Sequence, residues 1–220
     1  MKPILYVGNR NYSSWSLRPW LVLAWSGLDF ETRTLPLGGA GYSHRQMPSV
    51  LAISPSGTVP ALHIGDDVIS DSLAISEWAA EQVPSLWPSA PIARAHARSA
   101  ACEMHSGFVA LRTHLTCNIR RRTAPRALNE EVARDVARIE TLWNTLRRRY
   151  GAGGPFLFGA TPTIADAFYT PVATRFRTYG VKLGEEAAQY SETLLTTPAF
   201  LEWEKEAIAE SWTIPESDEK

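Results

Sequence analysis

The chain has 220 residues, 45% of them hydrophobic, and its formal net charge is −1 at pH 7. This length allows one large domain or two small ones, and the apolar content is sufficient for a buried core. A net charge so close to zero argues against nucleic acid as the main partner. No apolar run is long enough to span a bilayer, and the first residues lack the pattern of a secretory signal, so we expect neither a membrane span nor export.

The two cysteines, Cys102 and Cys117, fall within one predicted helix, where they cannot bridge to each other. Free thiols are typical of a reducing compartment, so we expect a cytoplasmic protein. The chain has no Cys-x-x-Cys motif, which argues against disulfide-exchange chemistry as its function.

The first eighty residues predict alternating strands and helices. Residues 4–7 form an apolar run typical of a buried strand, and a helix follows whose apolar residues recur with helical period: Leu17, Trp20, Leu21, Ala24 and Leu28. The next predicted elements are a strand at 30–35, a short irregular helix at 43–51, hairpin strands at 58–64 and 68–69, and a helix at 71–82. The order β-α-β-α-β-β-α is that of a thioredoxin-like domain.

The second half predicts only helices. Two apolar stripes mark the first two: Met104, Phe108, Leu111, Leu115 and Ile119, then Val132, Val136, Ile139, Trp143, Leu146 and Tyr150. Thr163-Ile164-Ala165-Asp166 has the form of a capping box and begins a helix that we expect to reach about Tyr179. Two further helices are predicted at 185–195 and 198–211, followed by a loose tail at 215–220.

These elements predict an α/β domain followed by an all-helical domain. We place the thioredoxin-like domain at residues 1–83, a proline-rich linker at 84–91 and the helical domain at 92–212. The arginine runs 120–122 and 147–149 are expected to be solvated faces or ion-pair partners, since the whole chain is slightly acidic.

The segment around Pro60 and Asp71 predicts a site for a small acidic peptide. Proline inside a strand cannot donate to the ladder, and a cis bond after Val59 would leave the Val59 backbone free to pair with an extended ligand. Asp71-Ser72 then opens a helix, where the cap, the free N–H groups and the helix dipole favour an anion. The alternative is that these residues are an ordinary turn and an ordinary cap.

The order and spacing of these residues resemble a known family. Pro-Ser-Gly-x-Val-Pro-x-Leu at 55–62, a β-turn, and then acidic-Ser-x-x-Ile at 71–75 are similar to the glutathione-binding half of cytosolic glutathione transferases. The capped segment 163–166 matches a buried helix in the helical domain of that family. The resemblance implies glutathione as co-substrate, no metal, and a homodimer.

The resemblance also implies how glutathione is held. Its cysteinyl backbone would lie on Val59, before Pro60, while its γ-glutamyl carboxylate would meet Ser72 and its amino group Asp71. The glycyl carboxylate needs a cation or an amide, and the chain offers three candidates: His44, Arg45 and Gln46.

A hydroxyl group at a helix N-terminus can stabilise the thiolate that acts as the nucleophile. The pattern Ser-x-x-Ser-x-Arg, which begins at Ser13, resembles serine-type and especially zeta-like transferases, in which the first serine activates the glutathione thiol. We therefore place Ser13 first, Ser14 second and Tyr12 third as the hydroxyl donor. The alternative is that the serines only cap the helix. Trp15 stands where zeta-like members carry cysteine, which weakens the case for zeta-type isomerisation.

The electrophile is expected between Ser13 and the first long helix of the second domain. The candidate pocket residues are Trp15, Met104, His105, Phe108 and Arg112. His105 and Arg112 are seven residues apart and would share a helix face, where they could meet an anionic or polar substrate. The alternative is that Met104 and Phe108 belong to the core and that His105 lies at the domain interface.

The sequence therefore predicts a glutathione transferase that conjugates glutathione to a small electrophile. Two alternatives stay open: a glutathione-dependent cis/trans isomerase resembling maleylacetoacetate isomerase, and a non-catalytic glutathione-binding module that keeps only the fold.

Overall fold

A four-stranded sheet organises the first part of the computed structural model, which describes residues 2–39, 42–125 and 127–218. The strand order is β2-β1-β3-β4. Strand β1 (Ile4–Gly8) pairs parallel with β2 (Glu31–Leu35) and antiparallel with β3 (Ala61–Ile64), and β3 pairs antiparallel with β4 (Asp67–Ser70). The register sets Leu5 opposite Thr32 on one side and Leu62 on the other, so β1 lies inside the sheet.

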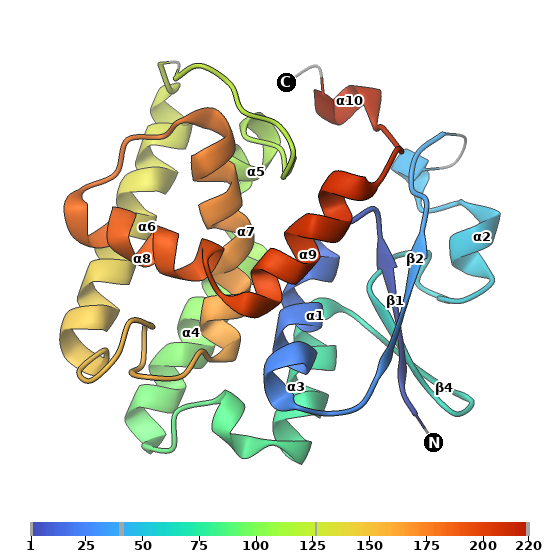
Figure 1. Ribbon diagram of the computed structural model, residues 1–220, viewed down its shortest axis with the longest axis horizontal. Helices are drawn as coiled ribbons and strands as arrows, with labels where there is room; N and C mark the ends of the chain where they lie inside the picture. The colour runs from blue at the N-terminus through green and yellow to red at the C-terminus, as the bar shows by residue number, and fades with distance from the viewer. Residues whose placement is uncertain (1, 40–41, 126, 219–220) are drawn as a thin grey trace.

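Two helices separate this sheet from the rest of the molecule (Figure 1). They are α1 (Ser14–Ser26) and α3 (Ser72–Gln82), whereas the short α2 (Pro48–Leu51) lies away from the helical half. A 3-10 turn, η1 (Tyr42–His44), precedes α2. The order β-α-β-α-β-β-α is the predicted one, and the thioredoxin-like fold of this half is confirmed.

The second part is helical, as predicted, and among its described residues only Phe156 and Gly159 form an isolated β-bridge. After the 3-10 turn η2 (Pro84–Leu86) its helices are α4 (Pro91–Ser106), α5 (Val109–His114), α6 (Glu130–Tyr150), α7 (Ile164–Tyr179), α8 (Glu185–Leu195), α9 (Pro198–Ala209) and α10 (Pro215–Asp218). Helix α7 is buried along almost its whole length, and its predicted capping box, Thr163 with Asp166, is present. The buried Asp166 also accepts a hydrogen bond from Tyr190 of α8 at 2.8 Å.

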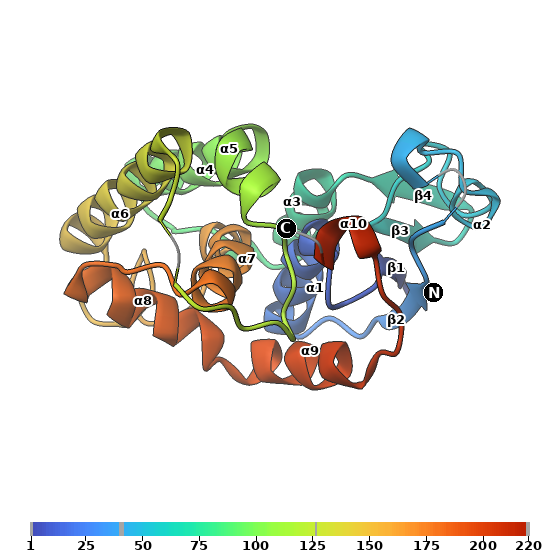
Figure 2. The ribbon, with the colours of Figure 1, turned by 90° about the horizontal axis from the view of Figure 1, so that it is seen from above.

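The last long helix, α9, returns along one side of the molecule and reaches the first half (Figure 2). Trp203 of α9 packs against Trp20 of α1, with 5.2 Å between ring centroids, and its indole N–H donates to the Arg10 carbonyl at 3.0 Å. Helix α1 also packs on α7, and one hydrophobic core runs from the sheet to the helical half. The two halves are therefore held by a common interior.

The structure corrects two of the predicted elements. Strand β3 begins at Ala61, not at residue 58, because the chain before it takes part in the turn around Gly57. The prediction that a single helix contains both cysteines is wrong. Helix α4 ends at Ser106, Phe108 adopts a left-handed conformation (φ 54°), and Cys117 lies beyond α5.

The prediction of a loose tail is wrong for the residues of the tail that the structure describes. Residues 215–218 form α10, and the Asp218 carboxylate accepts hydrogen bonds from Tyr12 Oη at 2.9 Å and Asn118 Nδ2 at 2.6 Å. Ile214 is buried beside Gly38. These contacts tie the end of the chain to both halves; residues 219 and 220 lie outside the described part.

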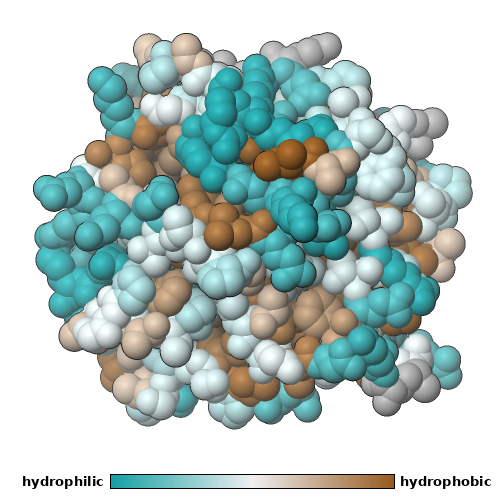
Figure 3. Space-filling model, viewed as in Figure 1, coloured by the Kyte–Doolittle hydropathy of each residue, from teal (hydrophilic) through white to brown (hydrophobic). Residues whose placement is uncertain are grey.

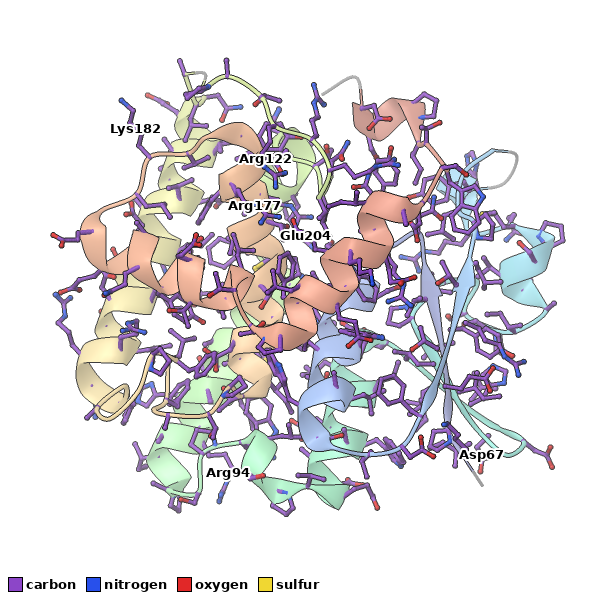
Figure 4. All side chains as sticks on the ribbon, viewed as in Figure 1. Asp67, Arg94, Arg122, Arg177, Lys182 and Glu204 are labelled. Atoms are coloured by element: carbon purple, nitrogen blue, oxygen red, sulfur yellow. The ribbon has the colours of Figure 1, made fainter. Side chains whose placement is uncertain are left out.

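The arginine runs contribute contacts within the chain. Arg122 and Arg177 both point toward Glu204 of α9 (Figure 4); Arg177 bonds its carboxylate, and Arg122 Nη2 lies 3.7 Å from it. The face that α9 crosses carries mixed polar and apolar residues, with apolar areas separated by polar ones (Figure 3). Among the helices of the described residues, none has the length and apolar character needed to cross a membrane.

Candidate active site

Two neighbouring cavities of about 170 and 290 Å³ share one wall beside the first turn of α1. Four residues line both of them: Trp15, Arg45, Thr58 and Val59. The first cavity also contacts Tyr12, Ser13 and Gly57, and the second also contacts Pro60, Asp71 and Ser72. The segments singled out at 12–15, 57–60 and 71–72 thus meet around one hollow region.

Ser13 is the N-cap of α1 and faces the first cavity. Its Oγ accepts from the Ser16 N–H at 3.4 Å and donates to Ser16 Oγ at 2.8 Å, while Ser16 Oγ accepts from the Gly8 N–H at 3.0 Å. The hydroxyl group is therefore fixed where β1 ends and α1 begins, at the positive end of the helix dipole.

Ser14 has a different environment from its neighbour. Its Oγ accepts a hydrogen bond from Arg175 Nη2 at 3.2 Å, across the boundary between the two halves. The same guanidinium donates to the carbonyls of Leu115 at 2.8 Å and Pro171 at 3.0 Å. Ser14 is not among the residues that line the two cavities, so the geometry favours Ser13 as the group that meets a ligand.

Tyr12, the third candidate, also lines the first cavity, but its hydroxyl group is already engaged. It donates to the Asp218 carboxylate at 2.9–3.0 Å and accepts from Arg120 Nη2 at 3.4 Å. Its ranking below the serines is consistent with this arrangement.

The bond between Val59 and Pro60 is cis, as predicted. The turn before it depends on Gly57, whose φ is +66° and where an added Cβ would lie 2.4 Å from the Arg45 carbonyl oxygen. This close approach brings Arg45 to the rim of both cavities. Of the candidates for the glycyl carboxylate, Arg45 is thus next to the site, whereas His44 and Gln46 have exposed side chains and do not line either cavity.

Asp71 and Ser72 begin α3 at the edge of the second cavity. Asp71 Oδ1 accepts from the N–H groups of Leu73 at 2.7 Å and Ala74 at 3.2 Å, which makes Asp71 the N-cap. Ser72 is 1% exposed, and its Oγ has no hydrogen-bond partner in the part of the chain that the structure describes. A buried hydroxyl group without a partner at a helix N-terminus is suited to a carboxylate ligand.

Two arginine guanidinium groups lie against the Trp15 ring. The Arg18 guanidinium lies 4.3 Å from the Trp15 ring centroid and 5.0 Å from that of Phe168, and that of Arg112 lies 5.5 Å from Trp15. Arg18 is 0% exposed, and none of its three guanidinium nitrogens has a hydrogen-bond partner among the described residues. Burial, and secondarily the charges of Arg175 and Arg112, lowers the pKa of Arg18 to about 9, so it stays cationic at neutral pH.

The residues predicted for the electrophile pocket fall into two groups in the structure. His105, whose ring lies edge-on to Trp15 at 5.2 Å, and Arg112 both reach the Trp15 ring. They do so from two helices, α4 and α5, and not from one shared face as predicted, because the chain turns at Phe108. Met104 is fully buried in the core and Phe108 is 7% exposed, so for these two the core alternative holds.

Sequence reasoning named Ser16 and Arg18 only as members of the motif that begins at Ser13, gave Arg18 no role, and missed Arg175. A signal existed for Arg18, since an arginine three residues after Trp15 falls on the apolar side of an otherwise buried helix. For Arg175, which is 161 residues from Ser14, there was none. Within the described residues, no three His, Cys, Asp or Glu side chains gather in a way that would hold a metal ion.

Comparison with known proteins gives two family models. Residues 12–82 match the glutathione S-transferase N-terminal domain, and residues 129–206 match the glutathione S-transferase C-terminal domain. Maleylacetoacetate isomerase from Pseudomonas aeruginosa is 30% identical over 188 residues, which cover 81% of this chain and 84% of the relative. A probable maleylacetoacetate isomerase from Caenorhabditis elegans is 28% identical over 204 residues, covering 91% and 92% of the two chains.

Solved structures show the same fold. A glutathione transferase homologue from Burkholderia GL BGR1, crystallised with bound glutathione, superposes with a TM-score of 0.70 at 24% identity and covers 94% of this chain and 98% of that chain. Matches to both domain models, together with a relative that is 30% identical over most of its length, show that this chain belongs to the glutathione S-transferase family.

Proposed function

We propose that this protein binds reduced glutathione, stabilises its thiolate through Ser13 and transfers the sulfur to a small electrophile. Membership in the family makes it a glutathione-dependent enzyme. The observation that carries the proposal is the convergence of two helix N-termini on adjoining cavities: Ser13 caps α1 on one side and Asp71 caps α3 on the other, with the cis Val59–Pro60 bond between them.

In this proposal glutathione extends along the two cavities. Its cysteinyl backbone pairs with Val59, and its γ-glutamyl carboxylate takes the unpartnered Ser72 hydroxyl group and the N–H groups of α3. Its amino group meets Asp71. Arg45, on the rim of both cavities, is our choice for the glycyl carboxylate.

Ser13 would then hold the thiolate. A rotation of its hydroxyl group away from Ser16 directs the hydrogen toward the cavity, while Oγ still accepts from the Ser16 N–H. A hydrogen bond to a charged group is worth about 1.5–3 kcal/mol, which corresponds to a lowering of the thiol pKa by about one to two units. The thiol gives up its proton to solvent, and the thiolate sulfur forms a bond to the electrophilic carbon. In a substitution the leaving group departs with its bonding electrons, and in an addition to a conjugated double bond the resulting carbanion takes up a proton from solvent.

The electrophile would lie against Trp15. Arg112 and His105 border this ring from the helical half, and a guanidinium such as that of Arg112 is cationic at neutral pH. This charge favours an electrophile with an anionic or strongly polar group, such as a carboxylate.

The test is an ultraviolet titration of the thiolate of glutathione bound to the pure protein, combined with the Ser13→Ala variant. We expect the bound thiol of the wild-type protein to titrate below free glutathione, and Ser13→Ala to keep glutathione affinity, lose this shift and lose about 10- to 100-fold in kcat/KM with an aryl halide. Ser85→Ala, at an exposed serine in η2, is the matched control and should behave as wild type.

Each contrary result has a distinct meaning. A Ser13→Ala variant with full conjugation rate would overturn the catalytic role of Ser13. A loss in Ser14→Ala instead would transfer the role to Ser14. Glutathione binding without a pKa shift would support the non-catalytic module.

Isomerisation is the second candidate, because two relatives are named as maleylacetoacetate isomerases. In that reaction the thiolate adds to a conjugated double bond, the resulting single bond rotates, and elimination restores both the double bond and glutathione. Incubation with a cis-enedione acid decides between the two: an isomerase converts it to the trans form without consuming glutathione, and a transferase accumulates the adduct.

We further propose a cytoplasmic homodimer that removes reactive electrophiles. Both cysteines, Cys102 and Cys117, are free thiols, which is consistent with a reducing compartment. Light scattering of the purified protein tests the dimer, and a mass near 24.4 kDa, that of one chain, would exclude it.

A further inference from the structure

The two oxygens of the Asp71 carboxylate contact different parts of the molecule. Its Oδ1 caps α3 by accepting from two backbone N–H groups. Its Oδ2 lies 3.2 Å from Nε2 of His105, which belongs to the last turn of α4 in the helical half. The oxygen that is not needed for the cap is therefore the one that His105 approaches.

His105 is held among aromatic rings and cations. Its ring lies edge-on to Trp15 at 5.2 Å and 6.2 Å from Phe168 of α7. Its other nitrogen, Nδ1, is buried and has no hydrogen-bond partner among the described residues. The imidazole ring thus has a single polar partner in this part of the structure, which is Asp71.

Three charged groups face His105 from the elements packed against it: Asp71 of α3, Arg18 of α1 and Arg112 of α5. Burial lowers the pKa of His105, the two arginines act in the same direction, and Asp71 opposes them. At neutral pH the ring is therefore uncharged, and its Nε2–H is placed to donate to Asp71 Oδ2.

We propose that His105 is a positioning residue for glutathione: as a neutral ring it orients Asp71 toward the amino group of the ligand, and as a cation it competes with that group. The inference rests on the proposed function, in which Asp71 receives the γ-glutamyl amino group. One carboxylate oxygen cannot fully neutralise both an ammonium and an imidazolium, and Arg18 and Arg112 add further positive charge nearby.

Binding and protonation are consequently linked. Because a protonated His105 disfavours a second cation at Asp71, affinity for the peptide falls as pH drops through the His105 pKa, which lies below its ordinary value of 6.5. By reciprocity, binding of the peptide lowers the pKa of His105 further and releases a proton in this range.

The experiment is isothermal titration calorimetry of the full-length protein with S-methylglutathione between pH 5 and 8. This peptide has no thiol to titrate, and its carboxylates and amino group keep their charges over the range. We expect the Kd to rise about fivefold or more from pH 8 to pH 5, in the range of typical couplings between two sites. In two buffers of different ionisation enthalpy, the heats should report proton release below pH 6.5, where His105 titrates.

Two variants isolate His105. His105→Gln can still donate to Asp71 but does not titrate, so it should bind the peptide about as wild type does at pH 8 and lose the pH dependence. His105→Ala removes the contact and should bind more weakly at every pH. His96→Gln, at an exposed histidine in α4 that lines neither cavity, is the matched control and should keep the wild-type profile.

A wild-type Kd that is flat with pH, or a His105→Gln profile as steep as that of wild type, would overturn the inference and leave the proposed function intact. Absence of S-methylglutathione binding at any pH would overturn the proposed function, and the inference with it.

Discussion

Arg18 brings a positive charge into the interior and has no ion-pair partner among the residues that the structure describes. Its guanidinium lies between the rings of Trp15 and Phe168, and two further cations, Arg112 and Arg175, contribute to the same region. Cation–π contacts offset only part of the cost of desolvating a charge. We therefore relate the buried Arg18 to the binding of anionic groups proposed next to Trp15, and not to packing.

We expect Arg18→Met to raise the free energy of unfolding by about 1–3 kcal/mol, because a buried charge is replaced by an apolar chain of similar volume. The proposed glutathione turnover should fall in the same variant, since a cation near the thiolate is lost. Urea denaturation and conjugation rates check both expectations. The control is Arg148→Met, at an arginine whose side chain is 67% exposed, with a change within about 0.5 kcal/mol.

The stability difference between wild type and Arg18→Met should also depend on pH. Burial lowers the pKa of Arg18 in the folded state from its ordinary value to about 9, so above pH 9 the unfolded chain holds more protons at this residue. Wild type therefore gains stability relative to the variant as pH rises above 9. A destabilised Arg18→Met variant would instead show that packing and cation–π contacts outweigh desolvation.

At the scale of elements, the turn between α4 and α5 shapes the electrophile side of the site. Phe108 is buried and has a φ of 54°, a conformation that bulky residues rarely adopt. Because the chain turns there, His105 at the end of α4 and Arg112 in α5 both reach Trp15. In one continuous helix through this segment, His105 and Arg112 would lie on the same face, seven residues apart, and would not approach Trp15 from two helices.

This turn predicts an unusual order of stabilities. Phe108→Ala should lose about 3–5 kcal/mol for the lost burial, and Phe108→Gly should be more stable than Phe108→Ala by about 1 kcal/mol, because glycine adopts positive φ without strain. At Ala95, an exposed position within α4, the change to glycine should cost about 1 kcal/mol. Denaturant unfolding measures all three, and a Phe108→Gly variant less stable than Phe108→Ala would contradict the argument.

At the scale of the molecule, polar and aromatic contacts join the two halves around the site. Asn11 donates to Asn118 Oδ1 at 2.9 Å, Ser14 accepts from Arg175, and Trp20 packs against Trp203. The Asp218 carboxylate connects Tyr12 and Asn118 from the end of the chain. Because these contacts join the two halves, unfolding of one half would remove contacts that stabilise the other.

We therefore expect one cooperative transition in urea, with tryptophan fluorescence and far-ultraviolet circular dichroism giving the same midpoint. The shared core along α1, α7 and α9 is the reason, since opening either half exposes apolar surface of the other. Two separated midpoints would show that the halves unfold independently.

Much of the fold could be predicted because its signals are local. The cap at Asp71, the capping box at Thr163 and the helical period of α6 each depend on residues a few positions apart. The break at Phe108 and the ordered tail escaped prediction for the opposite reason. No local pattern required an aromatic residue with positive φ, and Asp218 is ordered by Tyr12, 206 residues away.

For the site, the sequence by itself determined which segments carry it: the serines at the start of α1, the cis proline segment and the Asp-Ser start of α3. The steric and capping preferences of each segment depend on residues a few positions apart, so they can be predicted from the sequence. Only the tertiary structure decided which serine faces the cavity, that Arg18 is enclosed beside Trp15, and that His105 reaches Asp71. Those features depend on burial and on charges brought together from distant positions, and electrostatic interactions follow distance in space and not separation along the chain.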